Sequence, residues 1–349
     1  MPEAWAASVE WFACGDPPST AGCCALGSIS SALVSFAGPA DMPPVRSRAL
    51  PLAALLTGAI ALGSSPILVR LSELEPTATA FYRVALAAPA FLPFLLADAK
   101  PSATAPKSRA GPSELFWLIA AGGFFALDLL CLHWSLRYTS VANATLFLNF
   151  APFFVAFGAW AVFRQRPAPR AVMSFAIAIG GIALLVGGVT TPTSARTAGD
   201  LLGILAGAAY GGYLLVVSRF RHHTPTSIVM GVTTLSCALF LLLATLAMGE
   251  GLVPKTATAW AVLLALALLT HAGGQGLLVF AMKYLPAFTS SITLLLQPVV
   301  AACGAWIIFS ETLGVWQLLG GGIVLLGIVL CHDAATRPAA DAARAKSAS

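Results

Sequence analysis

Residues 136–154 read LRYTSVANATLFLNFAPFF, and residues 282–300 read MKYLPAFTSSITLLLQPVV. Each passage begins with a cation and a tyrosine, continues through small hydroxyl-bearing residues, and carries an apolar run to a proline. A gap-free alignment at an offset of 146 pairs Pro152 with Pro298. The two passages therefore indicate an internal duplication.

The similarity continues on both sides of these passages. At the same offset Gly181 aligns with Gly327, and at an offset of 149 Gly58 aligns with Gly207. The difference between the two offsets implies one small insertion or deletion. We infer two copies of one unit rather than two segments that share only an apolar composition.

The composition places the chain in a membrane. Of its 349 residues, 58% are hydrophobic and 9% are charged, and the mean hydropathy is +0.86. A soluble domain carries about 25% charged residues, so this chain does not have enough polar surface to face water. The net charge of +5 is spread over short loops, which does not favour nucleic-acid binding. The seven cysteines show no metal-ligand spacing, and we expect no metal and no cofactor.

Ten apolar stretches of about 20 residues are candidate transmembrane helices. They lie at roughly 50–69, 77–97, 115–136, 140–163, 170–189, 200–218, 227–248, 258–281, 286–309 and 314–331. With the N-terminus in the cytoplasm, the cytoplasmic segments hold 14 Lys and Arg, and the opposite segments hold 4. This bias predicts that both termini are cytoplasmic. Pro152 and Pro298 lie inside spans and are expected to kink their helices.

The expected organisation has four segments. Residues 1–45 are expected to form a disordered extension, and Met42 is a possible translation start because a positive-inside first helix follows it. The first repeat is expected at 46–190 and the second at 199–332, and residues 333–349 are expected to form a disordered cytoplasmic tail.

Each copy holds five expected helices, and an odd number makes the second copy enter the membrane from the opposite side. The expected fold class is therefore an all-α membrane protein with ten transmembrane helices in two inverted five-helix repeats. Such repeats are characteristic of secondary transporters, whose substrate site lies near the midplane between the repeats.

Three stretches also carry a family resemblance. They are GSSPILVRLSELEPTATAFYRVALA at 63–87, TSVANATLFLNFAPFFVAFGAW at 139–160, and LLLQPVVAACGAWIIFSETLGVWQLLGGGIVLLGIVL at 294–330. Together they resemble the EamA-like branch of the drug/metabolite transporter superfamily, over about residues 46–332. The resemblance implies ten helices packed around a central cavity, with both termini cytoplasmic. It is broad for substrate, because the family handles amino acids, nucleotide-linked sugars, vitamins and drugs.

The first repeat departs from the family pattern at one turn. The family often has Gly-Glu there, whereas this chain reads FRQR at 163–166. Glu311 keeps the acidic residue at the corresponding turn of the second repeat.

Ionisable residues inside spans are functional candidates by default. Arg83 and Asp128 lie at matching depths, roughly 9 and 10 Å from the same surface at a rise of 1.5 Å per residue. We expect them to form an ion pair. Three interpretations stay open: Asp128 binds a substrate amine or a proton and Arg83 modulates it, the pair is a static brace between helices, or the two residues do not meet.

Further polar candidates lie on the third and fourth expected helices. His133 is expected as a polar residue at the outer interface, and Trp134 as an interface anchor or a stacking face. Asn143, Thr145 and Asn149 supply donors and acceptors, and the last two share a helix face near a proline kink. That face favours cavity lining, with interhelical hydrogen bonding as the alternative.

The second copy carries a related polar set. Its candidates are His271, Gln275, Thr293, Gln297, Tyr210 and Tyr213. The first four form two pairs at a spacing of four residues, so each pair shares a helix face. For His271, a satisfied core histidine is the alternative to a site residue.

We expect a secondary transporter that moves a small metabolite or an amphipathic compound by alternating access, in the direction of export and without ATP. The expected location is the plasma (inner) membrane. The expected partners are a small-molecule substrate and the lipid bilayer, with no nucleic acid, and the sequence leaves the oligomeric state open. The alternatives are an intramembrane enzyme and a membrane scaffold. An enzyme needs a nucleophile–base pair or a metal cluster, which the sequence does not present, so we expect no enzymatic activity.

Overall fold

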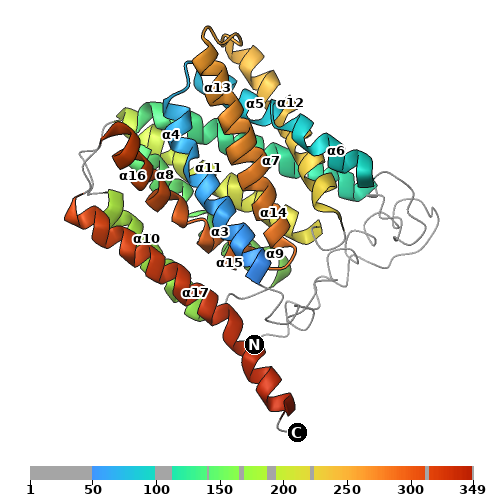
Figure 1. Ribbon diagram of the computed structural model, residues 1–349, viewed down its shortest axis with the longest axis vertical. Helices are drawn as coiled ribbons and strands as arrows, with labels where there is room; N and C mark the ends of the chain where they lie inside the picture. Colours follow the sequence, from blue (N-terminus) through green and yellow to red (C-terminus); the bar gives the residue numbers. More distant parts are fainter. Residues whose placement is uncertain are drawn as a thin grey trace, which may run out of the picture. The chain divides into compact units, whose positions relative to one another are not determined.

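The computed structural model describes residues 49–98, 112–139, 141–164, 169–186, 194–220, 224–310 and 314–347. The expected extension at 1–45, the possible start at Met42 and the acidic Glu311 lie outside these residues. Every secondary-structure element within the described ranges is a helix (Figure 1). The expected all-α class is confirmed.

The helices of the first half run from α3 to α10. They are α3 (Ala49–Gly63), α4 (Ser65–Arg70), α5 (Pro76–Ala85), α6 (Ala88–Asp98), α7 (Pro112–Tyr138), α8 (Val141–Leu148), α9 (Ala151–Phe163) and α10 (Pro169–Val186).

The helices of the second half run from α11 to α17 and include a π-helical segment, η3. They are α11 (Ser194–Phe220), α12 (Thr226–Met248), α13 (Ala257–Ala265), η3 (Leu266–Gln275), α14 (Gly276–Met282), α15 (Ala287–Thr293), α16 (Leu296–Phe309) and α17 (Val315–Ser347).

Six stretches of the described chain are long and apolar enough to cross a membrane. They are Ala49–Arg70, Pro112–Tyr138, Thr197–Phe220, Thr226–Met248, Ala257–Met282 and Ala287–Ile308. Each coincides with an expected span. Three of the other four expected spans contain shorter apolar helices, such as Pro169–Leu184 and Val315–Cys331, so length and composition do not confirm the count of ten.

Prolines explain where several helices break. The α8–α9 break at Asn149 and Phe150 comes just before Pro152, and the α15–α16 break comes just before Pro298. A proline inside a helix removes one hydrogen bond and clashes with the preceding turn. Kinks were expected at these two prolines, and the structure shows a helix break before each of them.

Equivalent helices in the two halves also end in the same way. Arg164 follows α9 with a φ of 56°, and Ser310 follows α16 with a φ of 54°. Within the described residues, these are the two residues other than glycine that have a positive φ. They align at the same offset of 146 as the two prolines, so the duplicated sequence has a duplicated backbone feature.

Glycines allow the helices of one half to approach those of the other. A Cβ added at Gly58 on α3 would lie 2.9 Å from the carbonyl oxygen of Gly274 on η3. A Cβ added at Gly207 on α11 would lie 2.9 Å from the carbonyl oxygen of Phe147 on α8. Small residues at such contacts let helix backbones pack closely in membranes.

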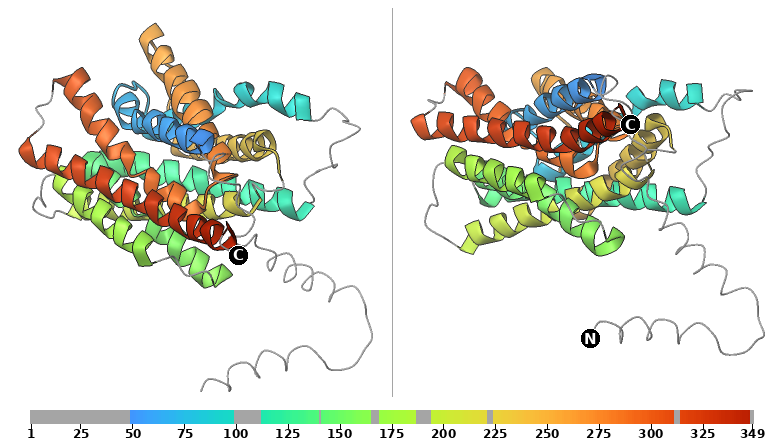
Figure 2. Two further views of the ribbon diagram at one scale, coloured as in Figure 1. Left: turned by 60° about the horizontal axis from the view of Figure 1, so that its bottom comes forward. Right: turned by 90° about the horizontal axis from the view of Figure 1, so that it is seen from below.

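The contacts between the halves are reciprocal. Helix α3 packs against η3, α14 and α16, and helix α11 packs against α7, α8 and α9. Helix α10 lies along α17, as Figures 1 and 2 show, and α12 contacts α5. The first helix of each half therefore contacts the third and fourth expected spans of the other half.

The last helix extends beyond the tenth expected span. Helix α17 continues to Ser347, although a disordered tail was expected from residue 333. The sequence of this segment is rich in alanine, which favours a helix, but it also contains Pro338, which opposes one. The expected disorder of residues 333–349 stays a prediction.

Candidate functional site

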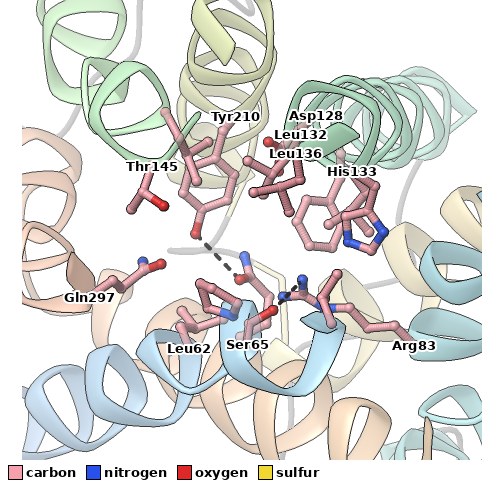
Figure 3. Close-up of a pocket in the computed structure, with 16 residues that line it drawn as sticks. Leu62, Ser65, Arg83, Asp128, Leu132, His133, Leu136, Thr145, Tyr210 and Gln297 are labelled. Carbon is pink, nitrogen blue, oxygen red and sulfur yellow. Dashed lines mark hydrogen bonds between the residues drawn. The ribbon is translucent and has the colours of Figure 1, made fainter. Parts of the chain in front are cut away.

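A small cavity with both polar and apolar lining residues lies where helices of both halves meet (Figure 3). Its volume is about 50 Å³, enough for a few water molecules. The lining residues with polar side chains are Ser65, Arg83, Asp128, His133, Thr145, Tyr210, Gln275 and Gln297. They come from α4, α5, α7, α8, α11, η3 and α16, so folding gathers them from both copies of the repeat.

Arg83 is 4% exposed and projects from α5 into the cavity wall. Its Nη1 donates a hydrogen bond to Oγ of Ser65 at 3.0 Å. Its Nε makes no hydrogen bond in the structure. Ser65 lies at the start of α4, where the helix is interrupted after Gly63. The interruption thus supplies the partner that holds the guanidinium.

Asp128 is 3% exposed and reaches the cavity from α7. Its Oδ1 has no hydrogen-bond partner. Figure 3 shows Asp128 on the α7 side of the cavity, whereas the Arg83 guanidinium is turned toward Ser65 on the opposite side. No direct ion pair within 4.0 Å joins Arg83 and Asp128, both of which are described, so the expected ion pair is not formed.

Two candidates from the second half meet at the cavity. The Tyr210 hydroxyl donates to Oε1 of Gln275 at 3.3 Å, a long hydrogen bond (Figure 3). Nε2 of Gln275 is buried without a partner. Thr145 and Gln297, which the sequence analysis placed near the two proline kinks, lie on the same wall.

Tyr213 and His271 lie behind the cavity rather than in its wall. The ring of Phe125, which lines the cavity, stacks on Tyr213 at 4.9 Å and on His271 at 5.4 Å between centroids. His271 Nε2 is 2.9 Å from Oγ1 of Thr234. These residues form an aromatic layer that closes one side of the cavity.

Other candidates are placed outside the cavity. Asn149 Nδ2 donates to the Thr145 backbone carbonyl at 2.6 Å, and Thr293 Oγ1 donates to the Thr289 carbonyl at 2.9 Å. Both side chains therefore bond to the preceding turn of their own helices. The side chain of Asn143 lies outside the described part of the structure.

Trp134 faces a separate hollow near the helix ends. Its Nε1 donates to Oγ1 of Thr77 at 3.0 Å, and its ring stacks on Tyr138 with centroids 6.1 Å apart. The hollow is lined by Trp134, Glu75 and residues 248–251. The structure therefore does not bring Trp134 together with Asp128 in the cavity.

His133 is buried, not exposed at an interface, and it contacts the first residue of α5. It is 2% exposed, and its Nδ1 lies 2.9 Å from the carbonyl oxygen of Pro76. It lines the cavity together with Ser65 and Phe125, which the sequence analysis did not select. Ser65 precedes Pro66, and a helix break at a proline was the available signal.

A second hollow continues from the cavity toward one end of the helices. The two share Pro66, Val69, His133 and Leu136 in their walls, and the second also includes Glu75 and Arg137. Arg137 and Glu75 form an ion pair at this end. The second hollow therefore adjoins the cavity and includes both residues of this ion pair in its wall.

Several membrane-spanning helices, a duplicated chain and a cavity between its two halves are typical of membrane transport proteins. Comparison with known proteins identifies the family. The model of the EamA-like transporter family matches residues 49–187 and again residues 197–331. This chain belongs to the EamA-like transporter family, and the resemblance stated from the sequence is confirmed.

Two relatives and one solved structure agree with this membership. Two proteins of Archaeoglobus fulgidus, each described as an "Uncharacterized transporter", are 26% and 25% identical over 277 and 280 residues. The first match covers 76% of this chain and 90% of the relative, and the second covers 80% and 94%. A protein of known crystal structure is similar in fold, with a TM-score of 0.67 at 16% identity over 83% of this chain and 99% of that one.

Proposed function

We propose that this membrane transporter is a secondary transporter that carries a small metabolite or an amphipathic compound through the cavity by alternating access. The observation that carries the proposal is the cavity itself. It is buried among apolar helices, yet both halves supply polar side chains to it, among them Arg83, Asp128 and Gln275. Buried polar atoms without partners are costly in a membrane, and a site for solutes accounts for them.

An inverted repeat accounts for the way the halves pack. The aligned glycines Gly58 and Gly207 make the same kind of close backbone contact with the opposite half. The aligned residues Arg164 and Ser310 end equivalent helices in the same left-handed conformation. Two copies of five spans, at 46–190 and 199–332, would place the second copy upside down and exchange the two access paths.

Hydrogen bonds at the helix ends support the proposed membrane topology. At one end, the Ser135 hydroxyl donates to the Gly199 carbonyl at 2.7 Å, and the Tyr82 hydroxyl donates to the Leu252 carbonyl at 2.6 Å. These bonds and the Arg137–Glu75 ion pair join residues in, or within about two helical turns of, the connections that follow the first, third, fifth and seventh expected spans. Turns after alternate spans lie on one side of a membrane. Together with the cation bias, this supports the proposal that both termini lie on the other, cytoplasmic side of the plasma membrane.

The proposal is tested with purified protein in liposomes loaded with a cell extract of metabolites. Mass spectrometry of the external medium, without ATP, is expected to find at least one small solute that leaves through the protein and not from empty liposomes. Overexpression in cells is expected to lower the internal content of that solute if the direction is export. Failure of every solute to leave through correctly folded protein would reject the transport mechanism, and a raised internal content would reject export.

A further inference from the structure

Two buried groups of opposite charge in the cavity keep hydrogen-bonding atoms unused. Arg83 Nη1 donates a hydrogen bond to Ser65, but the guanidinium has further N–H donors, and its Nε has no partner. Asp128 Oδ1 is likewise without a partner. Both side chains line one cavity, and no direct ion pair between them is formed within the described chain.

The charge balance of the cavity restricts what it accepts. Arg83 and Asp128 together contribute no net charge, although each charge is costly in an apolar surrounding. A ligand with a single charge would satisfy one of them and leave a net charge inside the protein. A ligand with one positive and one negative group would give each side chain a partner and keep the cavity neutral.

The geometry points to a small zwitterion as the ligand of this cavity, with its ammonium group held by Asp128 and its carboxylate held by Arg83. This assignment rests on the transport function proposed above. Hydrogen bonds between charged groups are about twice as strong as those between neutral groups, which favours this orientation over a reversed or neutral ligand.

The remaining walls fit the rest of such a molecule. Nε2 of Gln275 is a buried donor without a partner, so it can bond to a second oxygen of the carboxylate. Leu129, Leu132 and the ring of Phe125 provide an apolar wall for a short carbon skeleton. The cavity holds about 50 Å³ in this conformation, so the ligand enters as the helices move apart.

The competing reading is a static brace, in which Arg83 and Asp128 stabilise the fold and take no part in binding. Under that reading the charges of a ligand have no influence on its affinity. The two readings are separated by a series of ligands that differ only in charge.

The probes are ω-amino acids of increasing length, from glycine through β-alanine and γ-aminobutyrate to ε-aminocaproate. For each length, the matched alkylamine carries only the positive group and the matched alkanoate only the negative group. Binding is measured by the shift in thermal unfolding and by titration calorimetry of the full-length protein in detergent. At one or two lengths the zwitterion is expected to bind about tenfold more tightly than either matched compound.

Single-charge variants change the preference in opposite directions. Arg83→Gln is expected to bind the alkylamine as well as the zwitterion, and Asp128→Asn to bind the alkanoate as well as the zwitterion. The double variant Arg83→Gln/Asp128→Asn keeps the cavity neutral, which favours folding, and is expected to lose the zwitterion preference. Glu73→Gln, which alters a residue outside the cavity, is the control and keeps the wild-type preference.

Equal affinity of the wild type for a zwitterion and a matched compound would overturn the assignment, as would binding of no member of the series. The release of metabolites from loaded liposomes is independent of this result. Passage of a solute that is not a zwitterion keeps the transport function and rejects the ligand class. Passage of no solute rejects the transport function itself.

Discussion

Arg83 and Asp128 line one buried cavity from opposite sides, and the guanidinium of Arg83 is bonded to Ser65 rather than to the carboxylate. The two opposite charges therefore face each other across the cavity and do not form a direct ion pair. We therefore expect the energies of the two residues to be coupled through the cavity. Stability measurements on variants test the coupling directly.

Removing one charge is expected to destabilise the protein more than removing both. Arg83→Gln leaves Asp128 without a counter-charge, and Asp128→Asn does the same to Arg83, each at a cost of about 3 kcal/mol. The double variant leaves neither charge unbalanced and is expected to recover a large part of that loss. Thermal unfolding of the wild type, the two single variants and the double variant in one detergent gives a double-mutant cycle. Additive losses of stability from the two substitutions would contradict the coupling.

The contact between the halves at Gly58 is expected to tolerate no larger residue. Gly58→Ala places a methyl group 2.9 Å from the backbone oxygen of Gly274, and a backbone atom cannot move aside as a side chain can. The expected loss of stability is about 1–3 kcal/mol. The matched control is Gly180→Ala, where nothing lies within 4 Å of the added methyl group. Equal unfolding temperatures for the two variants would show that α3 and η3 are not packed as described.

The Thr234 hydroxyl is expected to stabilise the fold because it is the hydrogen-bond partner of the buried His271 imidazole. His271 Nδ1 already lacks a hydrogen bond, and Nε2 is 2.9 Å from the Thr234 hydroxyl. Thr234→Val would leave both ring nitrogens unsatisfied, at a cost of about 1–3 kcal/mol. Thr270→Val is the control, since that hydroxyl bonds only to the Leu266 carbonyl of its own helix. A larger loss for the control, measured by thermal unfolding, would contradict this account of His271.

Two acidic residues near one end of the helices are expected to differ in importance. Glu250 Oε2 accepts a hydrogen bond of 2.8 Å from the Ala78 backbone N–H in the first turn of α5, which has no other acceptor within that helix. Glu250→Ala is expected to cost about 1–2 kcal/mol, since a carboxylate that caps a helix start is stabilising.

Glu75 provides the comparison for Glu250. Its ion pair with Arg137 is about half exposed, at 53% and 49% of the side-chain surface. Glu75→Ala is expected to cost less than about 1 kcal/mol, because exposed ion pairs contribute little. The order of the two unfolding temperatures checks the prediction, and a reversed order would contradict it.

The sequence predicted those features that depend on local pattern. Apolar length located the helices, and the prolines located the breaks before Pro152 and Pro298. The duplication predicted which helices correspond, since equivalent residues repeat at one offset. These properties depend on residues that are near one another in the chain or identical in the two copies.

The local sequence pattern did not predict which side chains face the cavity, because that depends on how each helix is rotated about its axis. Tyr210 and Tyr213 are three residues apart, which turns a helix through about 300°, and only Tyr210 faces the cavity. Matching depth for Arg83 and Asp128 did not reveal that Ser65 would take the guanidinium, because that depends on how α4 is placed. The π-helical register of η3 has no signature in residue type, although such segments are frequent at functional sites.

The most direct test of the account is to fill the cavity covalently and measure transport. Leu132 on α7 lines the cavity, whereas Leu127 on the same helix is 38% exposed on the outer surface. Leu132→Cys and Leu127→Cys are made in a cysteine-free background, treated with a bulky thiol reagent, and assayed for solute release from loaded liposomes. The account predicts that the reagent stops release through Leu132→Cys and leaves Leu127→Cys unchanged. Undiminished release through fully labelled Leu132→Cys would show that solutes do not pass through this cavity.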